Sequence, residues 1–232
     1  MKQIKCCLDV DIHSCDFTWS LFQSALNSYR FDSCLRPYPS MFLKNGYKDP
    51  ARMRTVSNQL PDMKTLRDTL TELVYSQDTI ELLYWVLVQH RDPYLLLHVD
   101  DNARPKVSVL SQHISELQLT IVPNYIYEVV YSQQHEAQWQ QRKSNKNGSI
   151  YAFHGSRLDN FYSIIKFGLQ QHLSCSETLF GAGIYLSSEL LLSLTYSPAG
   201  IAWDKSIYGS NFSIVALCEM INDTEKVKCQ GL

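Results

Sequence analysis

The chain has 232 residues, enough for one large domain or two small ones with a buried core. Its formal net charge of -2 provides no positive field for a nucleic-acid backbone, so we expect no DNA or RNA partner. Apolar runs stay well below the roughly 20 residues that cross a bilayer. Met1 to Val10 lack the apolar segment of a secretory signal. We therefore expect a soluble chain without a membrane span.

The cysteines indicate a reducing compartment and no metal site. There are seven of them without a Cys-x-x-Cys pair, which favours free thiols over a disulfide framework. Cys6, Cys7, His13 and Cys15 lie close together in the sequence and are of the types that bind zinc. Their spacing matches no common structural zinc site, and no second ligand pair follows. We therefore predict no bound metal.

Residues 1–93 have the apolar spacing of helices. One helix is expected after Asp16, because Trp19, Phe22 and Leu26 recur at three- and four-residue steps. A second is expected from Pro61, and a third from near Asp78 until the break at residues 92–93. Between the first two helices, residues 36–39 and 49–50 are typical of turns and breaks.

From residue 94 onwards the pattern becomes mixed. Strands are expected at 95–99, 125–131, 150–153, 183–187 and 212–220. Two short helices are expected at 158–167 and 188–196, and an exposed loop at 133–148. Helices followed by strands predict an α+β fold, with an all-helical domain over 1–93 and a mixed α+β domain over 94–232.

One group of residues in the second part carries chemistry. His154 and Gly155 end a predicted strand, where an imidazole and a bare backbone can face a cleft. Another predicted strand presents Tyr185, while Ser193 and Tyr196 are three residues apart and share a helix face. Together they suit a flat aromatic amide held by stacking and hydrogen bonds. Taken singly, a His-Gly pair is usually a turn and a tyrosine usually a core residue, so only the combination is informative.

Two motifs and two later side chains carry a family resemblance. They are His-Gly-Ser-Arg at 154–157, Phe-Gly-Ala-Gly-Ile-Tyr at 180–185, Ser193 and Tyr196. In this order they resemble the diphtheria-toxin-like ADP-ribosyltransferases, and more narrowly the poly(ADP-ribose) polymerase family. With Leu-Arg-Pro-Tyr-Pro at 35–39, nearly the whole chain is similar to one branch, the small tail-anchored mono-ADP-ribosyltransferases of the endoplasmic reticulum.

The resemblance implies NAD as co-substrate and assigns roles to six residues. His154 would hold the adenosine-side ribose, and the Gly155 backbone with the Ser193 hydroxyl would hold the nicotinamide carboxamide. Tyr185 and Tyr196 would enclose the nicotinamide ring. Ser156 is also expected to bind the cofactor, and His154 and Tyr185 are the expected catalytic residues. Residues 170–179 would form the donor loop, and residues 1–93 a regulatory-type helical domain.

The same resemblance implies where the chain acts and on what. Proteins, the chain itself included, would accept the ADP-ribose, and the branch's address is the cytosolic face of the endoplasmic reticulum. Polymerising relatives have a glutamate at a third position near the end of the domain, and this branch a tyrosine. No residue here matches that position, so we expect a shortened catalytic domain without its last strands and anchor. An unpaired sheet edge and weak transfer would follow.

Three alternatives stay open at this point. The first is a catalytically impaired chain that serves as an NAD-binding or protein-interaction module. The second is a nucleic-acid or DNA-damage protein, which the lack of a basic patch disfavours. The third is a hydrolase that pairs Cys175 or Cys218 with His172 or His154, although no carboxylate accompanies either cysteine.

Overall fold

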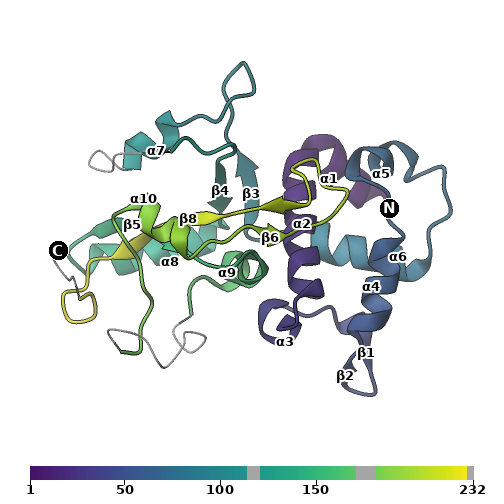
Figure 1. Ribbon diagram of the computed structural model, residues 1–232, viewed down its shortest axis with the longest axis horizontal. Helices are drawn as coiled ribbons and strands as arrows, with labels where there is room; N and C mark the ends of the chain where they lie inside the picture. The colour runs from purple at the N-terminus through teal and green to yellow at the C-terminus, as the bar shows by residue number, and fades with distance from the viewer. Residues whose placement is uncertain (114–120, 171–180, 229–232) are drawn as a thin grey trace.

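The computed structural model describes residues 1–113, 121–170 and 181–228. Helices occupy the first part of the chain, and strands with shorter helices the second, which confirms the predicted α+β class (Figure 1). The helical part consists of α1 (Lys2–Val10), α2 (Ile12–Asn27), α3 (Phe31–Cys34), η1 (Ser40–Phe42), α4 (Pro50–Asn58), α5 (Met63–Thr69), α6 (Gln77–Tyr84) and η2 (Trp85–Gln89), with a hairpin of β1 (Leu43–Lys44) and β2 (Tyr47–Lys48).

The second part contains two longer strand pairs. β3 (Tyr94–Leu97) runs antiparallel to β4 (Tyr127–Val130), and β5 (Ser149–Gly155) runs antiparallel to β8 (Val215–Ile221). These positions confirm four of the five predicted strands. The remaining elements are α7 (Ser108–His113), α8 (Gln133–Ser144), η3 (Leu158–Asn160), α9 (Phe161–Phe167), α10 (Leu190–Thr195), β6 (Gly200–Ile201) and β7 (Asn211–Phe212).

α2 is the central helix, and it begins earlier than predicted. Its cap is Asp11, whose side chain accepts a hydrogen bond from the Ser14 amide at 2.9 Å, so Asp16 lies inside the helix and not at its start. The Asp16 carboxylate is fully buried and accepts bonds from the Ser206 hydroxyl and the Ile207 amide. Burial raises the pKa of this carboxyl above its usual range. α2 therefore contacts the second part of the chain as well as the other helices.

Three predictions of local structure were wrong. The expected break at Asp49-Pro50 is the start of α4, because proline fits the first helical turn and Asp49 caps it through the Arg52 amide. The expected loop at 133–148 contains helix α8, which is exposed and has no apolar face. The expected strand at 183–187 is reduced to a single bridge between Ser187 and Phe153.

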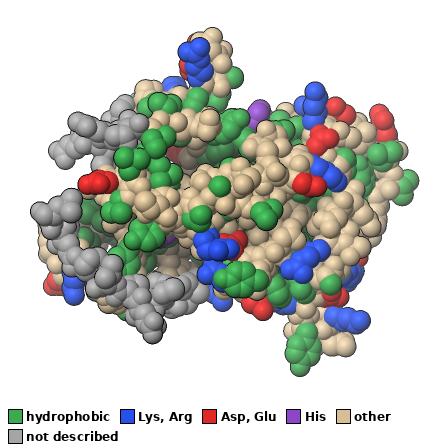
Figure 2. Space-filling view, in the orientation of Figure 1, with side chains coloured by type: hydrophobic (Ala, Val, Ile, Leu, Met, Phe, Trp, Pro, Cys, Tyr) green, Lys and Arg blue, Asp and Glu red, His purple; other side chains and the backbone are tan. Residues whose placement is uncertain are grey.

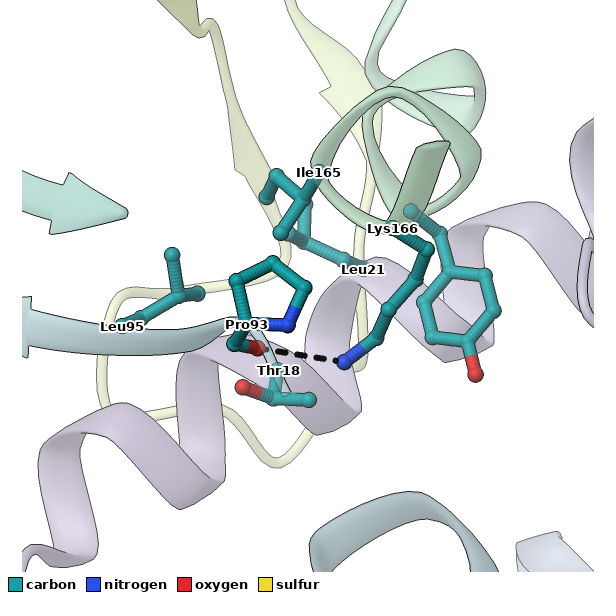
Figure 3. A pocket seen from close by; sticks show the side chains of 7 residues that line it. Thr18, Leu21, Pro93, Leu95, Ile165 and Lys166 are labelled. Atoms are coloured by element: carbon teal, nitrogen blue, oxygen red, sulfur yellow. Dashed lines mark hydrogen bonds between the residues drawn. The ribbon is translucent and has the colours of Figure 1, made fainter. Parts of the chain in front are cut away.

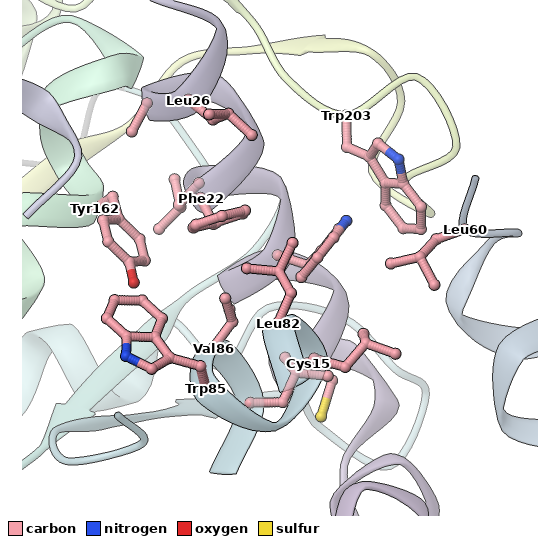
Figure 4. Close-up of a cluster of buried hydrophobic side chains, with 14 of the residues drawn as sticks. Cys15, Phe22, Leu26, Leu60, Leu82, Trp85, Val86, Tyr162 and Trp203 are labelled. Carbon is pink, nitrogen blue, oxygen red and sulfur yellow. The ribbon is translucent and has the colours of Figure 1, made fainter. Parts of the chain in front are cut away.

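A single hydrophobic core extends across both parts of the chain (Figure 4). Phe22 of α2 packs edge-on against Tyr162 of α9, with ring centroids 5.7 Å apart. Trp19 packs edge-on against Trp203 from the second part, at 6.3 Å. All four rings are almost completely buried. Because burial of aromatic side chains is a large stabilising contribution, we expect the two parts to fold and unfold together.

Lys166 of α9 lies at the junction of the two parts, beside a cavity of about 10 Å³ (Figure 3). Its ammonium donates hydrogen bonds to the backbone oxygens of His90 and Pro93. Thr18 and Leu21 of α2 line the same cavity. Burial lowers the pKa of Lys166 to about 8, and the nearby Asp92 carboxylate only partly offsets this. The protonated form of Lys166 therefore lowers the free energy of unfolding.

We expect this effect to make stability depend on pH. The folded-state pKa of Lys166 lies below its unfolded value of 10.5. The unfolded chain therefore binds more protons between pH 8 and 10.5, and the Lys166 contribution to stability rises with pH in that window. The total change is on the order of 3 kcal/mol. Urea denaturation across this range should show the free energy of unfolding of wild type rising with pH relative to that of Lys166→Met; a pH-independent difference between the two chains would contradict it.

Candidate functional site

The end of β5 is the structural centre of the predicted site. Along one edge β5 is paired with β8 over its whole length, from Ser149 to Gly155. On its other edge, Phe153 exchanges two backbone hydrogen bonds with Ser187, of 2.7 and 2.9 Å. Paired on both edges, the strand holds His154 and Gly155 in fixed positions.

Gly155 allows β5 and α10 to approach more closely than any other residue would. A Cβ atom built on Gly155 would lie 1.8 Å from the Ser193 carbonyl oxygen and 3.1 Å from the Ser197 hydroxyl oxygen. The first distance is far inside van der Waals contact, and its partner is backbone that cannot swing aside. The glycine of the His-Gly pair is therefore required by packing.

His154 and Tyr185, grouped by sequence reasoning, meet in the structure. The imidazole Nδ1 lies 2.9 Å from the Tyr185 carbonyl oxygen. Because a carbonyl oxygen only accepts, Nδ1 carries the proton, and in the neutral ring Nε2 is then an acceptor. Across the part of the chain that the structure describes, Nε2 bonds to no other group. It is therefore available to accept a hydrogen bond from a sugar hydroxyl.

The two tyrosine rings are both exposed, but Ser193 is not. Tyr185 is 39% exposed, and its hydroxyl donates to the Gly181 carbonyl oxygen at 2.5 Å. Tyr196 is 63% exposed and lies just past α10, which ends at Thr195. Ser193 is buried inside the helix, with its hydroxyl donating to the Phe153 carbonyl oxygen at 3.2 Å. Tyr196 is the C-cap of α10 with helical backbone angles, and its amide donates to the Ser193 carbonyl oxygen at 3.1 Å, so it follows Ser193 in the last turn of the same helix.

Ser156 is held by two residues that sequence reasoning missed. Its amide donates to the hydroxyl of Ser197, which is buried, at 3.1 Å. Its own hydroxyl oxygen accepts from the Asn160 side-chain amide at 2.9 Å. Neither Ser197 nor Asn160 stands in a pattern that marks it, since their partners are brought together by the fold. Both belong to the immediate surroundings of the His-Gly pair.

Two cysteines of the described ranges have thiol pKa values above the usual range. Burial raises the pKa of Cys15 to about 12 and that of Cys218 to about 11. Because the thiolate is the nucleophile, Cys218 is a poor candidate for hydrolysis at neutral pH. The other proposed pair, His172 and Cys175, lies outside the described residues, as does the expected donor loop apart from Gln170.

The described ranges contain no metal-type cluster and no helix of membrane-spanning length. No three His, Cys, Asp or Glu side chains of the described residues gather where they could hold a metal ion. Among the helices described, none has the length and apolar character needed to cross a membrane. On the face shown in Figure 2, basic and acidic side chains are interspersed and no basic stripe is visible.

Two comparisons with known proteins bear on the site. Residues 6–87 match the family profile described as ARTD15 N-terminal domain, and residues 108–230 that described as Poly(ADP-ribose) polymerase catalytic domain. The chain is 36% identical to Protein mono-ADP-ribosyltransferase PARP16 of Mus musculus over 222 residues, 95% of this chain and 66% of that protein. The Homo sapiens PARP16 is also 36% identical, over 221 residues and with the same shares. Protein mono-ADP-ribosyltransferase PARP8 of Homo sapiens is 26% identical over 205 residues, 78% of this chain and 22% of that protein.

Proposed function

Because the chain belongs to the poly(ADP-ribose) polymerase family, we propose that it is an NAD-dependent protein mono-ADP-ribosyltransferase. In this proposal it moves ADP-ribose from NAD to protein side chains and releases nicotinamide. The membership confirms the resemblance inferred from the motifs around His154 and Tyr185. The chain spans 66% of the length of the two PARP16 relatives, so the activity in their names is proposed here and not carried over.

The observation that supports the proposal best is the close packing of Gly155 on α10. It joins a strand end that lacks a side chain to the helix that leads into Tyr196, and His154 at the same strand end contacts Tyr185. A bare backbone amide, an acceptor nitrogen and two exposed phenol rings are what an aromatic carboxamide joined to a ribose requires.

The described side chains fit NAD with one adjustment. His154 Nε2 is free to accept from a ribose hydroxyl, and the Tyr185 and Tyr196 rings are exposed for stacking. The Ser193 hydroxyl already donates to Phe153, so in this arrangement its oxygen can only accept from the carboxamide N–H. A Ser193 hydroxyl that donates to the carboxamide would first have to turn away from the strand.

The residues act by positioning. Bound NAD supplies a ribose–nicotinamide bond whose cleavage leaves positive charge on the sugar while nicotinamide departs neutral. The two tyrosine rings and the Gly155 backbone hold the leaving ring in one orientation, and His154 holds the far ribose. Fixing both ends directs the weakened bond toward an acceptor side chain, and positioning of this kind contributes several kcal/mol to catalysis. We also propose that the chain acts at the cytosolic face of the endoplasmic reticulum and that proteins accept the ADP-ribose.

The proposal is tested with NAD labelled at two places. One sample carries its label on the adenylate phosphate, and the other on the nicotinamide ring. We expect the adenylate label to become covalently attached to protein. We expect the nicotinamide label to be released as free nicotinamide, in an amount equal to the ADP-ribose attached. Stable uptake of NAD with no label on protein would instead favour the non-catalytic NAD-binding module.

Tyr185 provides a test of the stacking role. We expect Tyr185→Ala to lower transfer by roughly 5- to 150-fold, the range of a lost aromatic stack of about 1–3 kcal/mol. Tyr185→Phe keeps the ring and loses the hydroxyl bond to Gly181, so most activity should remain. The initial rates of transfer by the two variants are compared with that of wild type. The control is Tyr47→Ala, because Tyr47 is another exposed tyrosine and lies in the β1–β2 hairpin. Equal losses in Tyr185→Phe and Tyr185→Ala would contradict stacking.

A further inference from the structure

A polar cluster joins the helical part of the chain to the turn that follows Gly155. In η3, the carboxylate of Asp159 accepts from the Ser28 hydroxyl at 2.6 Å. The next residue, Asn160, receives two donors on its side-chain oxygen Oδ1, the Arg30 guanidinium and, at 3.3 Å, the Cys34 thiol. These partners lie 126 to 131 residues apart in the sequence. The fold has therefore brought the end of α2 and α3 directly onto the turn that carries the site.

The cluster has a fixed direction, because a guanidinium can only donate hydrogen bonds. With Arg30 and Cys34 donating to Oδ1 of Asn160, the amide nitrogen Nδ2 must face the other way. Nδ2 donates to the Ser156 hydroxyl oxygen at 2.9 Å. Since that oxygen is engaged as an acceptor, the Ser156 proton is left to donate elsewhere. Each group in the series therefore sets the donor direction of the next.

A second set of contacts fixes the same turn in place. Asp159 is 5% exposed, and besides Ser28 it accepts from Arg157 Nε at 3.2 Å. The Arg157 guanidinium also lies over the Tyr29 ring, 5.8 Å from its centroid. The turn would therefore stay near the helical part even without Arg30. What Arg30 adds is the orientation of the Asn160 amide.

We propose that Arg30 is a positioning residue for NAD: through Asn160, it fixes the Ser156 hydroxyl as a hydrogen-bond donor toward the co-substrate. The inference rests on the proposed function, which assigns Ser156 to NAD. Without the Arg30 guanidinium, only the weak thiol donor of Cys34 holds Oδ1 of Asn160, and the amide can turn over. Its oxygen would then accept the Ser156 proton, and NAD would lose that donor.

The Asn160→Asp variant tests whether Arg30 orients the Asn160 amide or only stabilises the position of the turn. Aspartate has nearly the same shape and keeps the contact with Arg30 as an ion pair. Its second oxygen, however, accepts from Ser156 where the amide donated. We expect the Kd for NAD to rise about 5-fold or more, the worth of one hydrogen bond of about 1 kcal/mol. The melting temperature should not fall.

Benzamide is the control ligand, because it carries an aromatic carboxamide without the riboses. Its proposed partners are Gly155, Ser193 and the two tyrosines, so its Kd should be unchanged in Asn160→Asp. Arg30→Met should weaken NAD binding to the same extent as Asn160→Asp. The matched variant is Arg54→Met, since Arg54 donates to the Leu26 backbone oxygen at the end of α2 and does not touch Asn160. It should leave the NAD affinity unchanged.

The outcomes separate the two levels of inference. An Asn160→Asp chain that binds NAD as tightly as wild type contradicts the role of Arg30 and leaves the proposed function intact. An Arg54→Met chain that loses as much NAD affinity as Arg30→Met also contradicts it, because the effect would then be general bracing. A wild-type chain that binds neither NAD nor benzamide contradicts the proposed function, and this inference with it.

Discussion

Replacing Gly155 by alanine is expected to lower ADP-ribose transfer by at least about 100-fold, while most of the fold survives. The new Cβ would lie 1.8 Å from the Ser193 carbonyl oxygen, so β5 and α10 must move apart. That movement separates the residues proposed to hold the two ends of NAD. A displacement of about 1 Å at a reacting centre costs on the order of 100-fold in rate. Initial transfer rates and the Kd for NAD measure the effect.

Gly183→Ala is the control for Gly155→Ala. It also adds one methyl group in the predicted NAD-binding segment, but its Cβ would meet no atom within 4 Å. We expect its melting temperature to equal that of wild type, whereas Gly155→Ala should melt lower. A Gly155→Ala chain with wild-type transfer would contradict the close packing of β5 on α10.

Truncating Trp203 to alanine is expected to destabilise the whole chain by about 3–5 kcal/mol, the usual cost of removing a large buried aromatic. Trp203 is 4% exposed and packs against Trp19 of the helical part. Total stabilities of domains are about 5–15 kcal/mol, so this is a large fraction. Because the core is shared, both parts should lose stability by the same amount. Urea denaturation followed by circular dichroism, with amide exchange in α2 and in β5, checks this.

Tyr47→Ala is the matched exposed truncation. This aromatic side chain is 79% exposed in the β1–β2 hairpin, so its loss should change stability by no more than about 0.5 kcal/mol. Separate unfolding transitions for α2 and β5 in Trp203→Ala would show two independent cores. That result would contradict the single core described here.

The sequence pattern located elements where local residues decide the structure. Trp19, Phe22 and Leu26 have helical spacing and do form the buried face of α2. The start of that helix was misplaced, because Asp11 and Asp16 are equally good caps in isolation. The Ser14 amide bond to Asp11, together with the burial of Asp16 against Ser206, shows which of them is inside. A choice between two local options was thus settled in part by a contact with the distant part of the chain.

The missed helix α8 and the wrongly predicted strand at 183–187 were both decided by contacts with other strands. α8 has no apolar face, so periodicity could not detect it; Trp139 and Lys143 instead bond to the Glu219 carboxylate on β8. Residues 183–187 have the composition of a strand, but within this segment only Ser187 pairs with β5. Pairing partners, and not composition alone, determine whether such a segment is a strand.

The candidate site was predictable in its motifs and not in its surroundings. His154, Gly155 and Tyr185 stand in short motifs that a single sequence reveals, and the structure brings them together. The Arg30–Asn160 contact joins residues 130 positions apart. Neither residue has a neighbour in the sequence that marks it. Hydrogen-bond direction around Ser156 is a property of the folded chain alone.

The most direct measurement is of nuclear Overhauser contacts between the ring protons of bound benzamide and the protein. If the aromatic carboxamide lies between the two phenol rings, its protons should show contacts to both Tyr185 and Tyr196, and the contacts should vanish when NAD is added in excess. Contacts to only one tyrosine, or to neither, would contradict the proposed site.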